Sequence, residues 1–191
     1  MSQLLEQILE RENMMTAYKK VKSNGGAGGI DGISTKDVRD YLVKNWSGIR
    51  EQIRQRKYKP QPVKRVEIPK PSGGVRNLGI PNVIDRIIEQ AVAQVLTPIV
   101  EPHFSEYSYG FRPNRCAQQA VIKLLEYFND GYTYIVDIDL EKFFDNVHHD
   151  KLMTLVRNII HDPDTESLIH KYLRAGVMIK GKYEDTPVGT P

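Results

Sequence analysis

The chain has 191 residues, a formal net charge of +3 and a single cysteine, Cys116. This length allows one large domain or two small ones, and one cysteine excludes an internal disulfide framework, so we expect a reducing compartment and a Cys116 that packs as a small apolar side chain. The N-terminus has no signal-peptide core and no apolar run reaches transmembrane length, so we expect a cytoplasmic protein that does not bind membranes.

Charge is distributed unevenly along the chain. Residues 50–76 hold nine Lys or Arg against two Glu, whereas residues 137–150 hold five acidic residues against one Lys. Either segment alone is consistent with a solvated charged surface, but the two together suit a polyanion that is held by one and processed at the other. The basic residues here that we expect to contact nucleic acid are Arg54, Arg56, Lys57, Lys59, Lys64 and Arg65.

The N-terminal part of the chain is predicted to be helical. Apolar residues at helical spacing predict a helix over residues 2–22 and a second helix that Ser34 caps. Between them, residues 23–32 include five glycines, which are typical of a flexible linker or of a backbone that approaches another segment closely. This loop follows a helix and lacks the Lys-Ser/Thr ending of a phosphate-binding loop, so the nucleotide-loop signal is weak.

A β-hairpin is predicted next. Residues 63–68 alternate as a strand, residues 75–80 form a second strand, and the glycines between them form the turn. Lys70 and Arg76 therefore lie at or beside the tip. They suit contact with a triphosphate, because Arg presents a planar fork and Lys a point charge, but an ordinary solvated tip can carry the same residues.

The middle of the chain contains a helix expected in the core, a loop rich in aromatic residues and arginines, and a further helix. Asn82 caps a helix with a strongly apolar face, which is typical of core. Residues 104–115 then interleave aromatic residues with Arg112 and Arg115. This pattern suits base stacking with phosphate contacts, or a structured loop with half-buried tyrosines. A helix that starts at Asn114 is expected to turn its apolar residues inward.

The acidic segment, residues 134–150, is predicted to be a strand, an aromatic bend and then a helix capped by Asp150. A period of two places Asp137 and Asp139 on the same side of the strand. Close carboxylates repel one another unless they share a proton or a cation, and oxygen ligands suit Mg²⁺. The alternative is a strand that ends in solvated carboxylates. His148 and His149 are expected to have capping or surface roles, because no cysteine cluster accompanies them.

Five stretches of the chain, in this order, resemble the N-terminal part of group II intron-encoded reverse transcriptases, also called maturases. The stretches are GGAGGIDGIS (25–34), VEIPKPSGGVRNLGIP (66–81), DRIIEQAVAQVLTPIVEPHFSEYSYGFRPNR (85–115), YIVDIDLEKFFDNVHHDKL (134–152) and TPVGTP (186–191). The resemblance covers nearly the whole chain. Retron and related bacterial reverse transcriptases share the acidic strand but fit the glycine-rich stretch less well.

The fold that this resemblance implies is an α+β right-hand polymerase. We expect fingers with an N-terminal helical extension over residues 1–105, mostly helical with a β-hairpin. A partial palm with an antiparallel sheet and interleaved fingers elements is expected over residues 106–191. The sequence lacks the family's Gln-Gly-Gly turn and its aromatic-Ala-Asp-Asp box. We therefore expect a truncation before the second catalytic box and no polymerase activity from these residues alone.

The resemblance also implies roles for individual residues. Asp139 matches the first catalytic, metal-binding carboxylate, with Asp137 and the backbone carbonyl of Leu140 as further metal ligands and Mg²⁺ as the cofactor. Lys70 and Arg76 match the positions that hold the incoming triphosphate. Phe144 matches the bulky residue beneath the sugar that excludes a 2′-hydroxyl.

The implied partners are group II intron RNA, an RNA template with a DNA primer, and a dNTP, in a bacterial cytoplasm and with a homodimer possible. The implied activity is RNA-directed DNA polymerisation that also assists intron splicing and mobility. One alternative is an RNA-binding splicing factor whose polymerase activity is incidental or lost. Another is a metal-dependent phosphatase or nuclease that uses Asp137 and Asp139, which leaves the basic hairpin unexplained.

Overall fold

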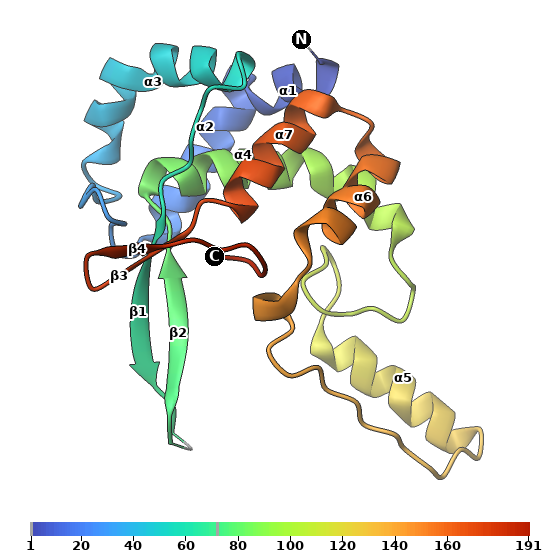
Figure 1. The fold of residues 1–191 in the computed structure, drawn as a ribbon. Helices are drawn as coiled ribbons and strands as arrows, with labels where there is room; N and C mark the ends of the chain where they lie inside the picture. Colours follow the sequence, from blue (N-terminus) through green and yellow to red (C-terminus); the bar gives the residue numbers. More distant parts are fainter. Residues whose placement is uncertain (1, 72) are drawn as a thin grey trace. The chain divides into compact units, whose positions relative to one another are not determined.

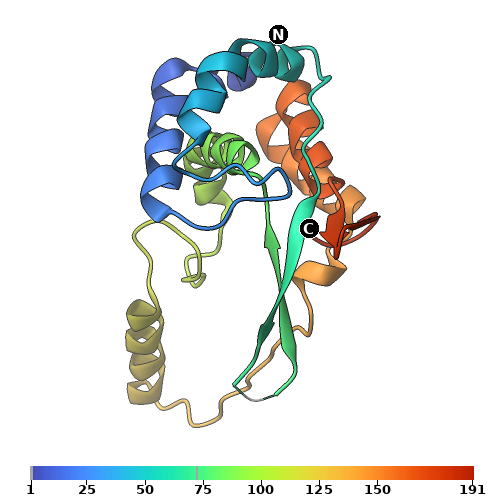
Figure 2. The ribbon, with the colours of Figure 1, turned by 90° about the vertical axis from the view of Figure 1, so that its left-hand side faces the viewer.

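The computed structural model describes residues 2–71 and 73–191 (Figures 1 and 2). The backbone separates into two compact units. Unit 1 takes in the chain up to Leu96 together with Lys142–Pro191, and unit 2 is Thr97–Glu141. These units differ from the division expected at residue 105, and the assignment of fingers and palm stays a prediction.

The described residues form an α+β fold, as predicted, with helices and strands at both ends of the chain. The helices are α1 Gln3–Ile8, α2 Arg11–Asn24, α3 Val38–Arg54, α4 Val83–Val100, α5 Ala117–Asn129, α6 His149–Ile160 and α7 Pro163–Leu173, with short 3-10 helices η1 Glu101–His103 and η2 Phe144–Asn146. The strands are β1 Val63–Pro69, β2 Val75–Ile80, β3 Val177–Ile179 and β4 Lys182–Glu184. None of these helices is long and apolar enough to cross a membrane.

The core of unit 1 lies among α1 to α4 and α7. The apolar face of α4 supplies Ile87 and Ile88, and α1 supplies Leu5 and Ile8, all of which are almost fully buried. Helix α4 is therefore the core helix that its periodicity predicts. Figure 1 shows the unit 1 helices gathered at one end of the β1–β2 hairpin, whose turn projects away from them.

The helix predicted over residues 2–22 is interrupted at Leu9 and Glu10, which separate α1 from α2. The Asn13 side-chain amide donates to the Ile8 carbonyl (2.8 Å) and to the Ala91 carbonyl of α4 (3.1 Å). The free carbonyl at the end of α1 is thus satisfied by a residue that α4 holds in place.

The glycine-rich loop approaches the start of α4 closely, which is one of the two alternatives that the sequence left open. A Cβ at Gly29 would lie 2.1 Å from Oδ1 of Asn82. Nearby, Arg86 donates to the Ala27 carbonyl (2.6 Å). The loop therefore packs against the N-terminus of a core helix and needs glycine for that contact.

The four strands form one sheet in the order β2-β1-β3-β4. The predicted hairpin is confirmed: β1 and β2 pair antiparallel, with Ile68 opposite Arg76 and Val66 opposite Leu78. The sheet is mixed, because β3 pairs with β1 in parallel at Val63 and Lys64 and with β4 antiparallel.

Unit 2 differs most from the sequence-based expectations. Residues 133–140 have no strand assignment, and Tyr134 (95% exposed) and Val136 (82%) lie in solvent. The strand prediction is therefore wrong for this structure, because an alternating segment needs a neighbouring strand for its backbone groups and finds none among the described residues. Helix α5 likewise buries none of its residues, and Cys116 is an exposed N-cap rather than a packed side chain.

Candidate nucleotide-binding and catalytic site

The tip of the β1–β2 hairpin carries Lys70 and Arg76. The Lys70 amide donates to the Gly74 carbonyl (3.0 Å), and the Gly73 amide donates to the Lys70 carbonyl (3.1 Å), which closes the turn. The ladder continues from this turn to the Ile68–Arg76 pair. Since residues two apart on a strand share a face, Lys70 and Arg76 lie on the same face of the hairpin.

Both cations are exposed, and neither side chain has a hydrogen bond or ion pair with another residue that the structure describes. Two unpaired cations at the same hairpin tip repel each other modestly in water, and an anion that binds both removes that repulsion. The hairpin tip can therefore hold a polyphosphate without first breaking an ion pair.

The aromatic bend before α6 forms η2. The Phe144 carbonyl accepts from the Thr190 amide (2.9 Å), and the Asn146 amide donates to the carbonyls of Lys142 and Phe143 (both 3.1 Å). Phe144 is 61% exposed, and its ring meets the Phe143 ring edge-on at 5.5 Å between centroids. The backbone is thus fixed while the ring remains available to a ligand.

The C-terminal loop, residues 186–191, holds this bend in place. The Gly189 amide donates to the Val147 carbonyl (2.8 Å), and Nε2 of buried His149 lies 2.6 Å from the Gly189 carbonyl oxygen. A Cβ at Gly189 would lie 2.6 Å from the Asp145 carbonyl oxygen. The sequence analysis assigned no such role to this loop or to His149. The only sequence feature that drew attention to the loop was TPVGTP (186–191), one of the five stretches that resemble the family.

Residues 134–141 of the acidic segment lie in unit 2, and Asp137, Asp139 and Leu140 are all exposed. Among the residues that the structure describes, no group of three or more His, Cys, Asp or Glu side chains could hold a metal ion. Two carboxylates and a carbonyl still fit a hard cation that takes one or two carboxylates together with substrate phosphates. The donor chemistry therefore suits Mg²⁺, with the set of ligands incomplete within these residues.

The predicted nucleic-acid contacts fall into two groups. Lys57, Lys59 and Lys64 are exposed. Arg54 instead holds Glu6 through two hydrogen bonds (2.9 and 2.5 Å), which lowers the pKa of that carboxyl, and Arg56 pairs with Asp164 (2.6 Å). Nε of Arg65 is buried and has no partner among the described residues.

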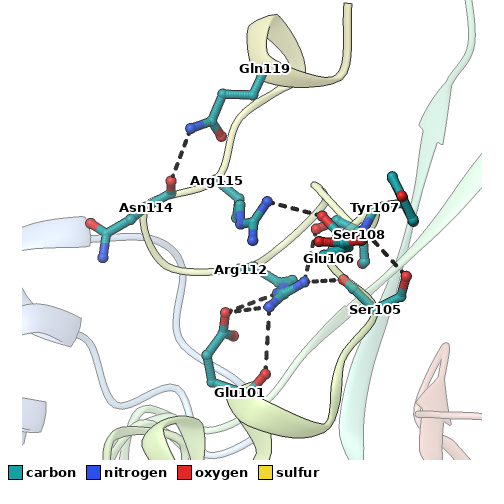
Figure 3. A network of polar contacts seen from close by, with 9 residues as sticks. All are labelled: Glu101, Ser105, Glu106, Tyr107, Ser108, Arg112, Asn114, Arg115 and Gln119. Atoms are coloured by element: carbon teal, nitrogen blue, oxygen red, sulfur yellow. Dashed lines mark hydrogen bonds and ion pairs between the residues drawn. The ribbon is translucent and has the colours of Figure 1, made fainter. Parts of the chain in front are cut away.

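Arg112 and Arg115 organise their own loop in unit 2 (Figure 3). Arg112 donates to the Glu101 carboxylate (2.9 and 2.7 Å) and to the Ser108 carbonyl (3.0 Å), and its side chain is only 8% exposed. Arg115 donates to the Glu106 carbonyl (3.0 Å) and lies over the Tyr109 ring. These contacts favour the structured-loop alternative for residues 104–115, and contact of both arginines with nucleic acid stays a prediction.

A buried polar cluster in unit 1 was missed from the sequence. Asp85 on α4 accepts hydrogen bonds from the hydroxyls of Tyr58 (2.6 Å) and Tyr172 (3.2 Å), and burial raises its pKa. One turn later, burial and the nearby Asp85 raise the pKa of Glu89 to about 7. An aspartate on an otherwise apolar helix face was the signal for this cluster.

The comparisons with known proteins agree with the motifs. The chain is 34% identical to protein YkfC of Escherichia coli (strain K12) over 194 residues, which is 98% of this chain and 51% of that protein. It is also 34% identical to the group II intron-encoded protein LtrA of Lactococcus lactis subsp. cremoris over 196 residues, which is 100% of this chain and 32% of LtrA. The chain thus spans about half or less of these relatives, and its resemblance to intron-encoded proteins is confirmed.

A solved structure described as a partial Cas6-RT-Cas1--Cas2 complex is similar to this chain, with a TM-score of 0.64 and 22% sequence identity. The match covers 100% of this chain and 31% of the chain in that complex. This likeness supports the fold alone. Residues 68–190 match the family described as reverse transcriptase (RNA-dependent DNA polymerase), a family that generally uses divalent metal ions. The hairpin tip, the aromatic bend and the acidic segment all lie within that match, and the chain belongs to the reverse transcriptase family.

Proposed function

We propose that this chain supplies the incoming-nucleotide side and part of the metal site of an RNA-directed DNA polymerase encoded by a group II intron. The observation that carries the proposal is the register of the β1–β2 hairpin. It places Lys70 and Arg76 on one face of an exposed tip, and no carboxylate that the structure describes pairs with either. Membership of the reverse transcriptase family supports a dNTP as the polyphosphate.

Each residue then has a separate task. Lys70 and Arg76 hold the triphosphate and offset the negative charge that develops as pyrophosphate leaves. Phe144 lies beneath the sugar and excludes a 2′-hydroxyl. The bond from the Thr190 amide to its carbonyl limits movement of the backbone that carries the ring, and a specificity contact of this kind depends on such support.

Asp137, Asp139 and the Leu140 carbonyl are the groups in this chain that would hold Mg²⁺. The chemistry that bound Mg²⁺ would supply there is activation of the primer 3′-hydroxyl and stabilisation of the leaving pyrophosphate, as in two-metal phosphoryl transfer. Asp139 is the catalytic carboxylate of this proposal, and Asp137 contributes from two residues before it.

The partners we propose are an RNA template with a DNA primer, a dNTP and group II intron RNA. The name of the relative LtrA, a group II intron-encoded protein, supports the intron RNA. Template binding through phosphates predicts a strong salt dependence and little sequence preference. A splicing factor without polymerase activity remains the second candidate, because intron RNA alone accounts for the exposed lysines but not for Phe144.

The test is primer extension on an RNA template by the complete gene product, with wild type beside Asp139→Ala, Asp137→Ala and the exposed control Asp40→Ala. We expect Asp139→Ala to abolish cDNA while RNA binding persists, and Asp40→Ala to behave as wild type. We expect no cDNA from the 191-residue chain alone. A wild-type protein that binds intron RNA tightly but extends nothing would establish the splicing-factor alternative.

A further inference from the structure

A groove of about 550 Å³ lies between α2 and α3 of unit 1. Figures 1 and 2 show these two helices beside each other. Leu9, which precedes α2, and Ile87 of α4 line the groove and are almost fully buried, so they belong to its floor. All the other lining residues lie on α2 and α3, which therefore form its two walls.

Both walls of the groove carry the same sequence pattern. The pattern is an arginine, two adjacent apolar residues three and four positions later, and an aromatic residue seven positions later. The residues that make it are Arg11, Met14, Met15 and Tyr18 on α2, and Arg39, Leu42, Val43 and Trp46 on α3. Because residues at these spacings share one face of a helix, each helix turns one apolar stripe, with an arginine at its start, toward the groove.

The apolar surface of the groove is uncovered. Val43 is 80% exposed and Met15 is 46% exposed. Tyr18, Leu42 and Trp46 pack against the core and also line the groove. Methionine adapts to the shape of a partner, and tryptophan, tyrosine and arginine are enriched among the residues that dominate binding energy. An apolar partner can therefore bind here without rearrangement of the core.

The groove is also positively charged. Arg11 and Arg39 make no hydrogen bond or ion pair with another residue that the structure describes, and none of the lining residues is acidic. Arg50 is the third arginine of the lining. The pKa of Glu6 is lowered chiefly by its bond to Arg54, and Arg50 lowers it only further. The charges on the two walls thus remain available to an acidic partner.

The length of the groove fits a short helix. Arg11 and Arg50 also line a second pocket together, so they mark one end of the groove, and Arg39 marks the other. Arg39 and Arg50 are eleven residues apart, which is about 16 Å along α3 at about 1.5 Å per residue. A partner helix of about three turns spans this length, and an amphipathic helix lays its apolar face into a groove of this kind.

We propose that this groove binds an amphipathic helix of a partner protein, with an apolar stripe between acidic residues at its two ends. The stripe packs on Val43 and Trp46. One acidic end meets Arg39, and the other meets Arg11 and Arg50. The groove shares no residue with the hairpin tip, the aromatic bend or the acidic segment, so the inference stands independently of the polymerase assignment.

A second copy of this chain suits the groove less well. Helix α5 buries none of its residues and offers an apolar face, but it has no acidic residue in its first turn. Its single glutamate, Glu126, already pairs with Lys123 (2.7 Å). This helix therefore lacks the acidic ends that the arginines of the groove favour.

The first test uses the complete gene product, with a synthetic peptide of about 16 residues as the probe. Leucines at i, i+3, i+4, i+7 and i+11 form its stripe, and glutamates lie at both ends. A matched peptide carries lysine in place of each glutamate. We expect micromolar binding of the glutamate peptide by fluorescence anisotropy, and affinity about tenfold lower or less for the lysine peptide. Equal affinities, or no binding of the glutamate peptide at about 100 μM, would overturn the proposal.

The second test changes the apolar wall. Met15→Gln combined with Val43→Gln alters two exposed positions, so the fold should persist, and peptide affinity should fall about tenfold or more. Leu155→Gln is the matched control, because it replaces an apolar residue of α6 that is 64% exposed and lies outside the groove. Affinity that is unchanged in the double variant would overturn the proposal.

The third test changes the charges. Arg11→Gln combined with Arg39→Gln should reduce peptide affinity about fivefold at low salt, and the difference should vanish at about 1 M salt, where charges are screened. Lys20→Gln combined with Lys44→Gln is the matched control, because these are exposed cations of the same two helices outside the lining of the groove. Equal losses in the two variants would show a diffuse electrostatic effect and would overturn the charge assignment.

Trp46 locates the bound peptide, since its ring lines the groove. We expect the peptide to shift the tryptophan emission of the wild type but not that of Trp46→Phe. A shift that persists in Trp46→Phe would place the peptide elsewhere and overturn the proposal. Displacement of the peptide by an oligouridylate of matched charge, or self-association of the protein that Val43→Gln abolishes, would assign the groove to RNA or to a second copy and overturn the choice of partner. None of these outcomes changes the Asp139→Ala extension result, so the two proposals fail separately.

Discussion

Nε2 of His149 lies 2.6 Å from the carbonyl oxygen of Gly189, and both residues are buried. Because a carbonyl can only accept, Nε2 must be the protonated nitrogen. The bond joins the first residue of α6 to the C-terminal loop, forty positions later in the chain. The same loop fixes the Phe144 carbonyl through Thr190. His149 therefore helps to hold the loop that supports Phe144, the residue that we place beneath the sugar.

The first prediction concerns this bond. His149→Ala removes the donor and leaves the Gly189 carbonyl unpaired, so we expect the free energy of unfolding to fall by about 1–3 kcal/mol. Hydrogen exchange at the Gly189 and Thr190 amides should accelerate, because both amides donate across the same junction. His148→Ala is the matched control: its side chain is exposed and makes no capping bond, and we expect a change within about 0.5 kcal/mol. Unchanged exchange at both amides in His149→Ala would contradict the role given to this residue.

The second prediction contrasts two glycines. Gly29→Ala places a Cβ 2.1 Å from Asn82 Oδ1 and 2.7 Å from the Asn82 backbone, so the start of α4 must shift, at a cost of about 1–3 kcal/mol. Gly48→Ala is the control within helix α3, where the new Cβ meets nothing within 4 Å. Alanine there should stabilise the helix by about 0.5–1 kcal/mol. Chemical denaturation of both variants measures the effect, and an unchanged or increased stability of Gly29→Ala would show that the glycine-rich loop is not packed as described.

The third prediction concerns pH. The pKa of Glu89 rises from an ordinary 4.5 to about 7, chiefly because of burial. Between these values the folded state keeps a proton that the unfolded state has lost, so stability falls as pH rises through this window. The loss can reach about 3 kcal/mol by pH 7 and then stops growing.

Glu89→Gln removes this titration. We expect the variant to match wild type at pH 4 and to exceed it at pH 8 by about 1–3 kcal/mol, as measured by urea unfolding across that range. The control is Glu184→Gln on an exposed residue of β4, which should give the wild-type pH dependence. If Glu89→Gln keeps the wild-type slope, the carboxyl is not protonated in the folded state.

The fourth prediction separates a structural role for Arg112 from a binding role. Arg112 joins Glu101 to the Ser105 and Ser108 carbonyls. Arg112→Gln should therefore accelerate exchange at the Ser108 and Arg115 amides of this loop. Arg115→Gln, which loses one bond to the Glu106 carbonyl, should have a smaller effect. Reduced RNA affinity in Arg112→Gln with unchanged exchange would instead make Arg112 a direct contact.

Local patterns predicted the elements that local interactions determine. The hairpin followed from alternation and turn residues, which place Lys70 and Arg76 at or beside its tip. Helix α4 followed from its apolar face. The predicted cap of α6 was two residues late, at Asp150 instead of His148, because a capping residue type does not by itself fix the position of a helix start.

Elements that depend on distant partners could not be predicted in this way. Residues 134–140 alternate as a strand should, but a strand also needs a neighbour, and the described residues supply none. His149 was expected to have a capping or surface role, yet it is buried and contacts the Gly189 carbonyl. The open pocket that Lys57, Lys59, Lys171 and Arg174 line gave no signal in the sequence, because only the packing of α7 against the segment after α3 brings these residues together.

The final prediction tests Phe144 as the residue that excludes ribonucleotides. The structure fixes its backbone through Thr190 and leaves the residue 61% exposed, so the ring can contact a ligand without rearrangement of the bend. In the complete polymerase, Phe144→Ala should raise the use of ribonucleotides relative to dNTPs by about tenfold or more, since a pocket wall that loses a ring no longer rejects a 2′-hydroxyl. Primer extension with each nucleotide type gives this ratio.

Phe143→Ala is the matched control, because the two rings are neighbours in one edge-on pair and both are more than half exposed. Its loss should weaken that ring contact and lower stability slightly without changing nucleotide choice. A change in sugar selectivity in Phe143→Ala and none in Phe144→Ala would move the sugar contact by one residue. Because the proposal places Phe144 rather than Phe143 beneath the sugar, we expect selectivity to follow Phe144.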